Sequence, residues 1–228
     1  MDDTLKIIAH IHTDLPEKFG VPRQSGLAGG LTGRIVFEPE FRSPDALKGL
    51  DEFKYLWLLW KFESVKSDAF NATVRPPRLG GNETRGVFAT RSPFRPNPIG
   101  LSCVKLEGIE ESSEGPVILV SGIDMRDNTP IYDIKPYLEY VDSKRGAGSG
   151  FADAHKDEKL RVSFPGELLN KIPAIKQEAL IEILSEDPRP HYQDDPLREY
   201  GLLFAGYNVK FKVSGNELSV ISVEKQTV

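Results

Sequence analysis

Five arginines gather in one proline-rich stretch of the chain, and their side chains are well suited to binding anions. The stretch runs from Arg75 to Arg95 and contains a single acidic residue, Glu83, so its local charge is +4. Guanidinium groups form paired hydrogen bonds with carboxylates and phosphates. The prolines restrict the backbone and present the arginines at little entropic cost on binding. These features predict an anion-binding surface; the alternative is a surface loop whose arginines pair with nearby acids.

Carboxylates dominate a second cluster, between Asp124 and Tyr137. Asp124, Asp127 and Asp133 lie within ten residues and could bind a hard cation, hold ribose hydroxyls or act as a general base. The segment Asp-Asn-Thr-Pro at residues 127–130 is also typical of a turn. Prolines and apolar residues separate the carboxylates, which disfavours a metal site.

Three further features are interpreted as structural, without a catalytic or ligand-binding role. His10 and His12 would face one side of a strand without a third ligand beside them. The glycine-rich residues 26–33 lack the spacing of a dinucleotide-binding loop. Cys103 falls in a predicted strand and is interpreted as a small core residue.

Composition narrows the class of protein. The chain has 228 residues, 39% apolar and 28% charged, which is ordinary for one large or two small globular domains. The net charge of −5 does not indicate nucleic-acid binding, but phosphate responds to local charge within about a Debye length. The longest apolar-rich run, residues 53–62, is about half of a bilayer crossing. We therefore expect neither a membrane span nor a secretory signal.

The number of cysteines indicates the cellular compartment of the protein. The single cysteine cannot form an internal disulfide, and no second cysteine accompanies the four histidines in a structural zinc site. We therefore expect a reducing, cytoplasmic location.

The elements that must position these residues are mainly β-strands. Gly, Pro and Asn separate short apolar segments, and residues 53–62 are aromatic enough to be covered on both faces. Ser43-Pro44 predicts one short helix. Closely spaced short strands favour a closed or nearly closed single-sheet β-barrel. The predicted strands are residues 5–12, 33–37, 53–62, 86–90, 100–106 and 116–123.

The composition changes after the predicted barrel, which we assign to residues 1–141. Residues 142–158 are rich in glycine and predict a linker or mobile loop. Residues 159–228 predict a small α+β domain, with an amphipathic helix between Pro173 and Asp187 and a hairpin that turns at residues 214–216. This unit alone would have a marginal core, so we expect it to pack on the barrel or on a partner chain.

Four motifs together resemble the TsaA-like domain proteins of the TrmO (YaeB) family. The two longest are RPPRLGGNETRGVFATRSPFRPNPIGLS, at residues 75–102, and DNTPIYDIKPY, at residues 127–137. The shorter ones are EKFGVPRQSGL, at residues 17–27, and DPRPHY, at residues 187–192, which resemble the two-part bacterial members. The resemblance covers the whole chain except the linker.

This resemblance implies a β-barrel that binds S-adenosylmethionine without a Rossmann fold, typically as a homodimer. It also implies methylation of N6 of threonylcarbamoyladenosine at position 37 of threonine tRNAs. The family commonly has histidine at the position of Glu63 and glycine at the position of Asn128, which tolerates positive φ. The implied cofactor-binding residues are Pro22, Arg23, Gln24, Glu63, Ser64, Arg91, Leu101, Asp127, Asn128, Thr129 and Pro130.

The implied acceptor nitrogen carries a carbamoyl group, so its lone pair is a poor nucleophile and its proton must leave. A base or hydrogen-bonding partner near N6 is therefore expected. We consider Asp133 and Tyr137 for this role, with Lys135 as an electrostatic helper.

For the tRNA backbone we predict cationic contacts from the proline-rich segment and further contacts from the DPRPHY motif. These residues are Arg75, Arg78, Arg85, Arg95, Arg189 and Tyr192. Two alternatives stay open: a module that binds S-adenosylmethionine or a nucleotide without catalysis, and a methyltransferase of the same fold with another acceptor. The local excess of arginine disfavours a small acceptor.

Overall fold

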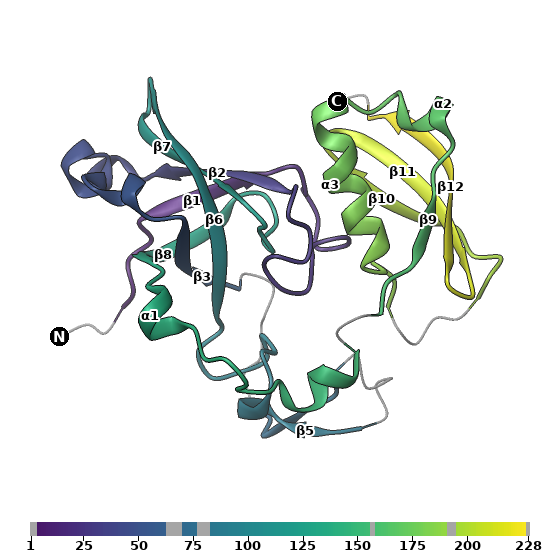
Figure 1. Ribbon diagram of the computed structural model, residues 1–228, viewed down its shortest axis with the longest axis horizontal. Coiled ribbons are helices and arrows are strands. Elements are labelled where there is room, and N and C mark those ends of the chain that lie inside the picture. Colours follow the sequence, from purple (N-terminus) through teal and green to yellow (C-terminus); the bar gives the residue numbers. More distant parts are fainter. Residues whose placement is uncertain (1–3, 63–69, 77–82, 156–157, 191–194, 227–228) are drawn as a thin grey trace.

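Six antiparallel strands close into a barrel in the N-terminal part of the chain (Figure 1). The computed structural model describes residues 4–62, 70–76, 83–155, 158–190 and 195–226. The predicted barrel is therefore confirmed. Its strands are, in spatial order, β1 (Ala9–Thr13), β2 (Thr32–Phe37), β7 (Gly115–Ser121), β6 (Ile99–Ser112), β3 (Tyr55–Lys61) and β8 (Thr129–Pro136).

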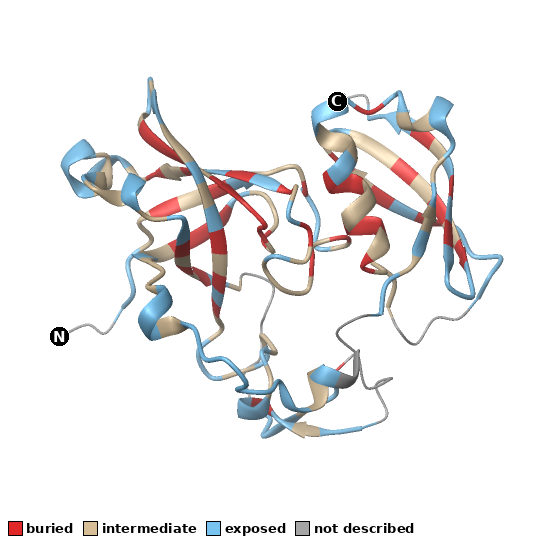
Figure 2. Cartoon of the chain, viewed as in Figure 1, coloured by how far each residue is buried: buried red, intermediate tan, exposed pale blue. Residues whose placement is uncertain are grey.

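The barrel core forms because alternate residues of each strand point inward. In β3, Leu56 and Leu58 are fully buried and Trp60 is 7% exposed, whereas Trp57 and Leu59 are only half-buried on the outer face. The prediction that residues 53–62 are covered on both faces was therefore wrong. An antiparallel barrel needs a continuous apolar face only on its inside. Figure 2 shows this as buried residues alternating with half-buried and exposed ones.

Three long connections leave the same end of the barrel. They are residues 14–31 between β1 and β2, residues 62–98 between β3 and β6, and residues 122–128 between β7 and β8. The register places them together, because the end of β1 and the end of β7 both pair with the start of β2. Likewise, the end of β3 pairs with the start of β6 and lies beside the start of β8. The predicted cofactor-binding residues that the structure describes lie on or next to these three connections.

The connection between β3 and β6 projects below the barrel in Figure 1. It contains a two-stranded ribbon, β4 (Thr73–Val74) with β5 (Arg85–Gly86), followed by the 3-10 turn η5 (Val87–Ala89). The strand predicted at residues 86–90 was therefore wrong. The chain turns there because Val87 is buried and its carbonyl accepts hydrogen bonds from both the N–H and the hydroxyl of Thr90.

The short helix predicted at Ser43-Pro44 forms as the 3-10 turn η2 (Pro44–Leu47), with Ser43 at its N-cap position. Two more 3-10 turns flank it, η1 (Pro39–Phe41) and η3 (Leu50–Glu52). Ser43 makes no capping hydrogen bond, and Gly49 adopts a left-handed conformation with φ of 80°. A residue in that conformation ends a right-handed helix.

The C-terminal part forms its own four-stranded sheet. The short helix α1 (Glu139–Asp142) ends where the predicted linker begins, and the 3-10 segment η6 (Gly150–His155) lies within the predicted linker. The predicted helix is confirmed as α3 (Ala174–Ser185), with Pro173 as its N-cap. The predicted hairpin is confirmed as β11 (Tyr207–Ser214) and β12 (Glu217–Lys225). The sequence prediction missed β9 (Arg161–Ser163), the short α2 (Gly166–Leu169) and β10 (Tyr200–Phe204).

The C-terminal part packs directly on the barrel connection at residues 14–31, with α3 between its sheet and the barrel (Figure 1). The carboxylate of Glu182 on α3 accepts a hydrogen bond of 2.8 Å from the backbone N–H of Gly30. The rings of Phe19 and Phe211 stack at 6.4 Å. Among the described residues, we find no helix with the length and apolarity needed to cross a bilayer.

Candidate functional site

Two predicted cofactor-binding residues from different connections meet at the open end of the barrel. The guanidinium of Arg91 donates a hydrogen bond to the side-chain oxygen of Gln24. Gln24 in turn donates from its amide nitrogen to the carbonyl of Arg23, at 2.6 Å. A guanidinium that binds an amide oxygen in this way can equally bind a carboxylate oxygen.

The loop that carries Gln24 is anchored to the edge of β6, beside Leu101. β6 extends past the end of β7. In this extension, the backbone N–H of Cys103 donates to the hydroxyl of Ser25 at 3.1 Å instead of to a neighbouring strand. The side chain of Leu101 points outward from this part of β6 and is 52% exposed. Leu101 therefore offers an exposed aliphatic side chain on the strand to which the Gln24 loop is anchored.

A buried carboxylate lies directly behind this loop. The hydroxyl of Ser102 donates to Asp124 at 2.5 Å, and the indole N–H of Trp60 donates to the Ser102 oxygen at 2.9 Å. Burial raises the pKa of Asp124 to about 6, although hydrogen bonds from Ser102 and from the backbone, and the charge of Arg91, oppose the rise. The sequence prediction grouped Asp124 with the acidic cluster and missed this network, because its partners come from distant strands.

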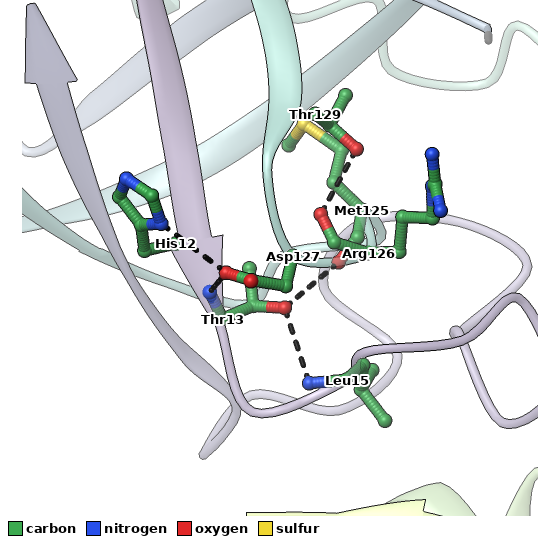
Figure 3. A network of polar contacts seen from close by, with 7 residues as sticks. All are labelled: His12, Thr13, Leu15, Met125, Arg126, Asp127 and Thr129. Carbon is green, nitrogen blue, oxygen red and sulfur yellow. Dashed lines mark hydrogen bonds and ion pairs between the residues drawn. The ribbon is translucent and has the colours of Figure 1, made fainter.

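The turn at residues 127–130 is held against β1, as Figure 3 shows. One carboxylate oxygen of Asp127 accepts a hydrogen bond of 2.9 Å from the backbone N–H of Thr13, and it lies 3.3 Å from Nδ1 of His12. Asn128 has φ of 61°, which explains how asparagine can replace the glycine common in the family. Thr129 is buried and Pro130 pairs with His10 in the sheet. Both interpretations of this segment, a turn and a ligand site, fit its geometry.

Asp133 lies on the outer face of the barrel, in one row with Leu101. The register pairs Asp133 with Leu59, and Leu59 with Leu101, across β8, β3 and β6. One oxygen of Asp133 accepts from the N–H of Ile134, and the other lies 2.7 Å from the ammonium of Lys135. Along this row, Asp133 on β8 is separated by β3 from Leu101 on β6, the strand that borders the Gln24 loop.

Tyr137 lies at the far end of β8 from the three connections. Its ring packs against Tyr55 at 6.2 Å and Trp57 at 5.8 Å, and its N–H donates to the carbonyl of Tyr55. The structure therefore separates Tyr137 from the Gln24–Arg91 pair, while Asp133 is closer to it along the strand.

The predicted RNA-binding arginines have different surroundings. Arg75 is exposed, whereas Arg85 forms an ion pair with Glu83 at 2.7 Å. Arg95 donates to the carbonyl of Thr90 at 3.2 Å, within the same connection. All three guanidinium groups belong to the projecting segment between β3 and β6.

The guanidinium of Arg189 forms an ion pair within the protein. It pairs with both carboxylate oxygens of Asp187, at 2.8 and 2.9 Å, and the side chain of Arg189 is only 11% exposed. The carbonyl of Asp187 accepts a hydrogen bond from Arg23, which joins the DPRPHY motif to the loop of Gln24. This geometry favours a structural role for Arg189 over the predicted contact with tRNA.

Some predicted residues lie outside the part of the chain that the structure describes. They are Glu63, Ser64, Arg78 and Tyr192. Within the described part, the structure contains no group of three or more His, Cys, Asp or Glu side chains placed to hold a metal ion.

Comparison with known proteins identifies the family. The model of the tRNA-methyltransferase O N-terminal domain matches residues 10–143, and that of the TrmO C-terminal domain matches residues 157–226. The chain belongs to the TrmO family. This confirms the membership that the motifs predicted.

Relatives match this TrmO-family chain over nearly its full length. A tRNA (adenine(37)-N6)-methyltransferase of Escherichia coli K12 is 35% identical, covering 95% of this chain and 96% of the relative. A putative S-adenosylmethionine-dependent methyltransferase, RcsF, of Pseudomonas aeruginosa is 39% identical, covering 89% of each. The crystal structure of TrmO from Pseudomonas aeruginosa superimposes with a TM-score of 0.79 at 32% identity, covering 99% of this chain and 98% of that one.

Proposed function

We propose that this chain transfers the methyl group of S-adenosylmethionine to N6 of adenosine 37 in tRNA. The proposal extends to an adenosine that already carries the threonylcarbamoyl group, in threonine tRNAs, and to a homodimeric enzyme in the cytoplasm. Its main structural support is the meeting of the three motif-bearing connections at one end of the barrel, where Arg91 contacts Gln24.

The described residues at that end fit the chemical groups of S-adenosylmethionine. Arg91 can pair with the carboxylate of the cofactor in place of Gln24. The exposed side chain of Leu101 offers an apolar surface for the adenine ring. Asp127, held in place by Thr13, can accept hydrogen bonds from ribose hydroxyls or from the amino group. When bound, the cofactor supplies an electrophilic methyl group on its sulfonium.

Proton removal from the acceptor is the chemical step that the chain itself must assist. Methyl transfer is an in-line displacement, so holding the acceptor nitrogen in position supplies much of the acceleration. We assign the proton acceptor to Asp133, whose carboxylate points outward in the row with Leu101. The ammonium of Lys135, 2.7 Å away, would fix its orientation and balance its charge. Tyr137 would support this strand through its ring contacts with Tyr55 and Trp57.

Electrostatics supports RNA as the acceptor. The described part of the connection between β3 and β6 carries Arg75, Arg85, Arg91 and Arg95 with Glu83 as its one acid. A cationic segment that projects from an acidic protein directs the phosphate backbone to this end of the barrel.

The proposal is tested by transfer of labelled methyl groups from S-adenosylmethionine to tRNA from cells that lack this methylation. The tRNA is then digested to nucleosides and analysed by mass. We expect label on N6-methyl-N6-threonylcarbamoyladenosine and none on control tRNA without the threonylcarbamoyl group. Cofactor binding by calorimetry without transfer to any tRNA would instead favour a non-catalytic binding module. Label on another nucleoside or on a small molecule would favour a different acceptor.

A further inference from the structure

Two phenylalanine rings stack on each other in solvent on the projecting connection between β3 and β6. Phe70 is 60% exposed and Phe88 is 73% exposed, and their ring centroids lie 6.2 Å apart with an interplanar angle of 26°. Together with Phe94, they are the only exposed phenylalanines in the described part of the chain. An exposed pair of aromatic rings marks a binding surface, because its apolar faces are stabilised only when a partner removes them from water.

The backbone holds this pair in a preformed position. The ribbon of β4 and β5 pairs Thr73 with Gly86, and the N–H of Val87 donates to the carbonyl of Ala72 at 2.9 Å. The side chain of Val87 is buried and anchors the ribbon, whereas the next residue, Phe88, is exposed. Figure 2 shows that most of this projecting segment is exposed. The platform therefore needs little reordering to accept a flat ring.

The positive charge on the same connection indicates which kind of partner the Phe70–Phe88 pair binds. Arg85 lies on the same ribbon, and its guanidinium is 6.0 Å from the ring centroid of Phe151. Arg75 directly follows β4, and Arg91 follows Phe88 by three residues. Exposed aromatic faces on a connection rich in arginine suit single-stranded RNA, whose bases stack on the rings while its phosphates meet the cations. A second copy of this acidic chain is the competing occupant.

We propose that Phe70 and Phe88 form a stacking platform for an unpaired base of the tRNA anticodon loop. The proposal rests on the function proposed above and adds to it a contact that reads RNA structure rather than charge. It separates two tasks on one connection: the arginines attract the phosphate backbone, and the aromatic pair holds an unstacked base.

The test measures binding of an anticodon stem-loop RNA to the full-length protein by fluorescence anisotropy at several salt concentrations. We expect Phe70→Ala and Phe88→Ala each to weaken binding by about 5- to 100-fold, the range typical of a lost base–aromatic stack. The slope of log K against log salt should stay unchanged, since stacking releases no counterions. Phe88→Trp should retain wild-type affinity because it keeps an aromatic face.

The control variant is Ile175→Ala, which removes an apolar side chain that is 86% exposed on α3. It should change neither RNA binding nor cofactor binding. The affinity of the two phenylalanine variants for S-adenosylmethionine should also equal that of the wild type, which excludes misfolding as the cause of their defect.

Three outcomes would overturn the platform. The first is unchanged RNA affinity in the Phe70→Ala, Phe88→Ala double variant while the wild type methylates tRNA, which leaves the proposed function intact. The second is a loss of self-association in sedimentation together with the loss of RNA binding, which assigns the pair to a contact between copies. The third is a wild type that binds no RNA, which overturns the proposed function as well. A wild type that binds the stem-loop through the pair but methylates no tRNA would overturn only the proposed function.

Discussion

The hydroxyl of Ser102 donates a hydrogen bond of 2.5 Å to the carboxylate of Asp124, which lies directly behind the loop of Gln24. Ser102 is fully buried and also accepts from the indole of Trp60. The backbone of Ser25 and the charge of Arg91 act on the same carboxylate. Asp124 therefore links the barrel interior to the loop and to the arginine that we assign to the cofactor.

The first prediction concerns pH and stability. Burial raises the folded-state pKa of Asp124 from its ordinary 3.8 to about 6, so the folded chain binds this proton more tightly than the unfolded chain. The contribution of Asp124 to the free energy of unfolding therefore falls as pH rises from about 4 to about 6, by at most about 3 kcal/mol, and stays constant above. Chemical denaturation across this range measures the effect.

The variant that tests this assignment is Asp124→Asn, which keeps an acceptor for Ser102 and cannot titrate. The difference in unfolding free energy between the two proteins should change across the same pH range. Glu107 titrates with the opposite effect on stability, because hydrogen bonds from Ser121 and Lys105 lower its pKa. Its contribution is the same in wild type and variant, so it cancels in the difference between their unfolding free energies. Parallel pH profiles for wild type and variant would contradict the role of Asp124.

The second prediction concerns the cofactor. Arg91→Ala should weaken binding of S-adenosylmethionine by about 10- to 100-fold, the loss expected for a charge-assisted hydrogen bond to a carboxylate. Arg161→Ala, which removes an exposed arginine on β9, serves as the matched control and should bind normally. Calorimetry measures the affinity of both variants for S-adenosylmethionine. Equal affinities of the two variants would show that Arg91 does not bind the cofactor.

Local patterns predicted the elements whose formation depends on nearby residues. Pro173 precedes α3 and cannot continue a helix toward its N-terminal side, so the start of the helix was evident. Gly215, with φ of 57°, supports the turn between β11 and β12. The close spacing of the short strands indicated the barrel, because closing the sheet removes its exposed edges. The strand β8 was not among those predicted.

Contacts between distant residues could not be predicted in the same way. Gln24 and Arg91 are 67 positions apart, and they meet only because closure of the barrel brings two connections to the same end. Val87 lies in an apolar run that resembles a strand, but tertiary burial turns the chain there into η5. The carbonyl of Asp187 accepts a hydrogen bond from Arg23, 164 positions away, which no local pattern in the DPRPHY motif indicates.

The third prediction distinguishes the arginines that we assign to RNA binding from Arg189, to which we assign a structural role. Arg75→Ala and Arg95→Ala should each weaken binding to all tRNAs and reduce the slope of log K against log salt by about 1. Arg189→Ala should leave this slope unchanged and lower the melting temperature instead, because it leaves Asp187 without its ion-pair partner. Salt titrations and thermal unfolding of the three variants provide the comparison. A reduced salt slope in the Arg189 variant would restore that residue to the RNA surface.

The fourth prediction concerns the proton acceptor. Asp133→Asn keeps the size of the side chain and the acceptor for the N–H of Ile134 but removes the negative charge, so kcat for methyl transfer should fall by about 100- to 10,000-fold. The affinity for S-adenosylmethionine should stay within about twofold of the wild type, because the role assigned to Asp133 is toward the acceptor nitrogen. Asp51→Asn, at an exposed position in η3, is the control and should retain full activity. Full turnover in the Asp133 variant, with normal cofactor binding, would show that the proton leaves by another route.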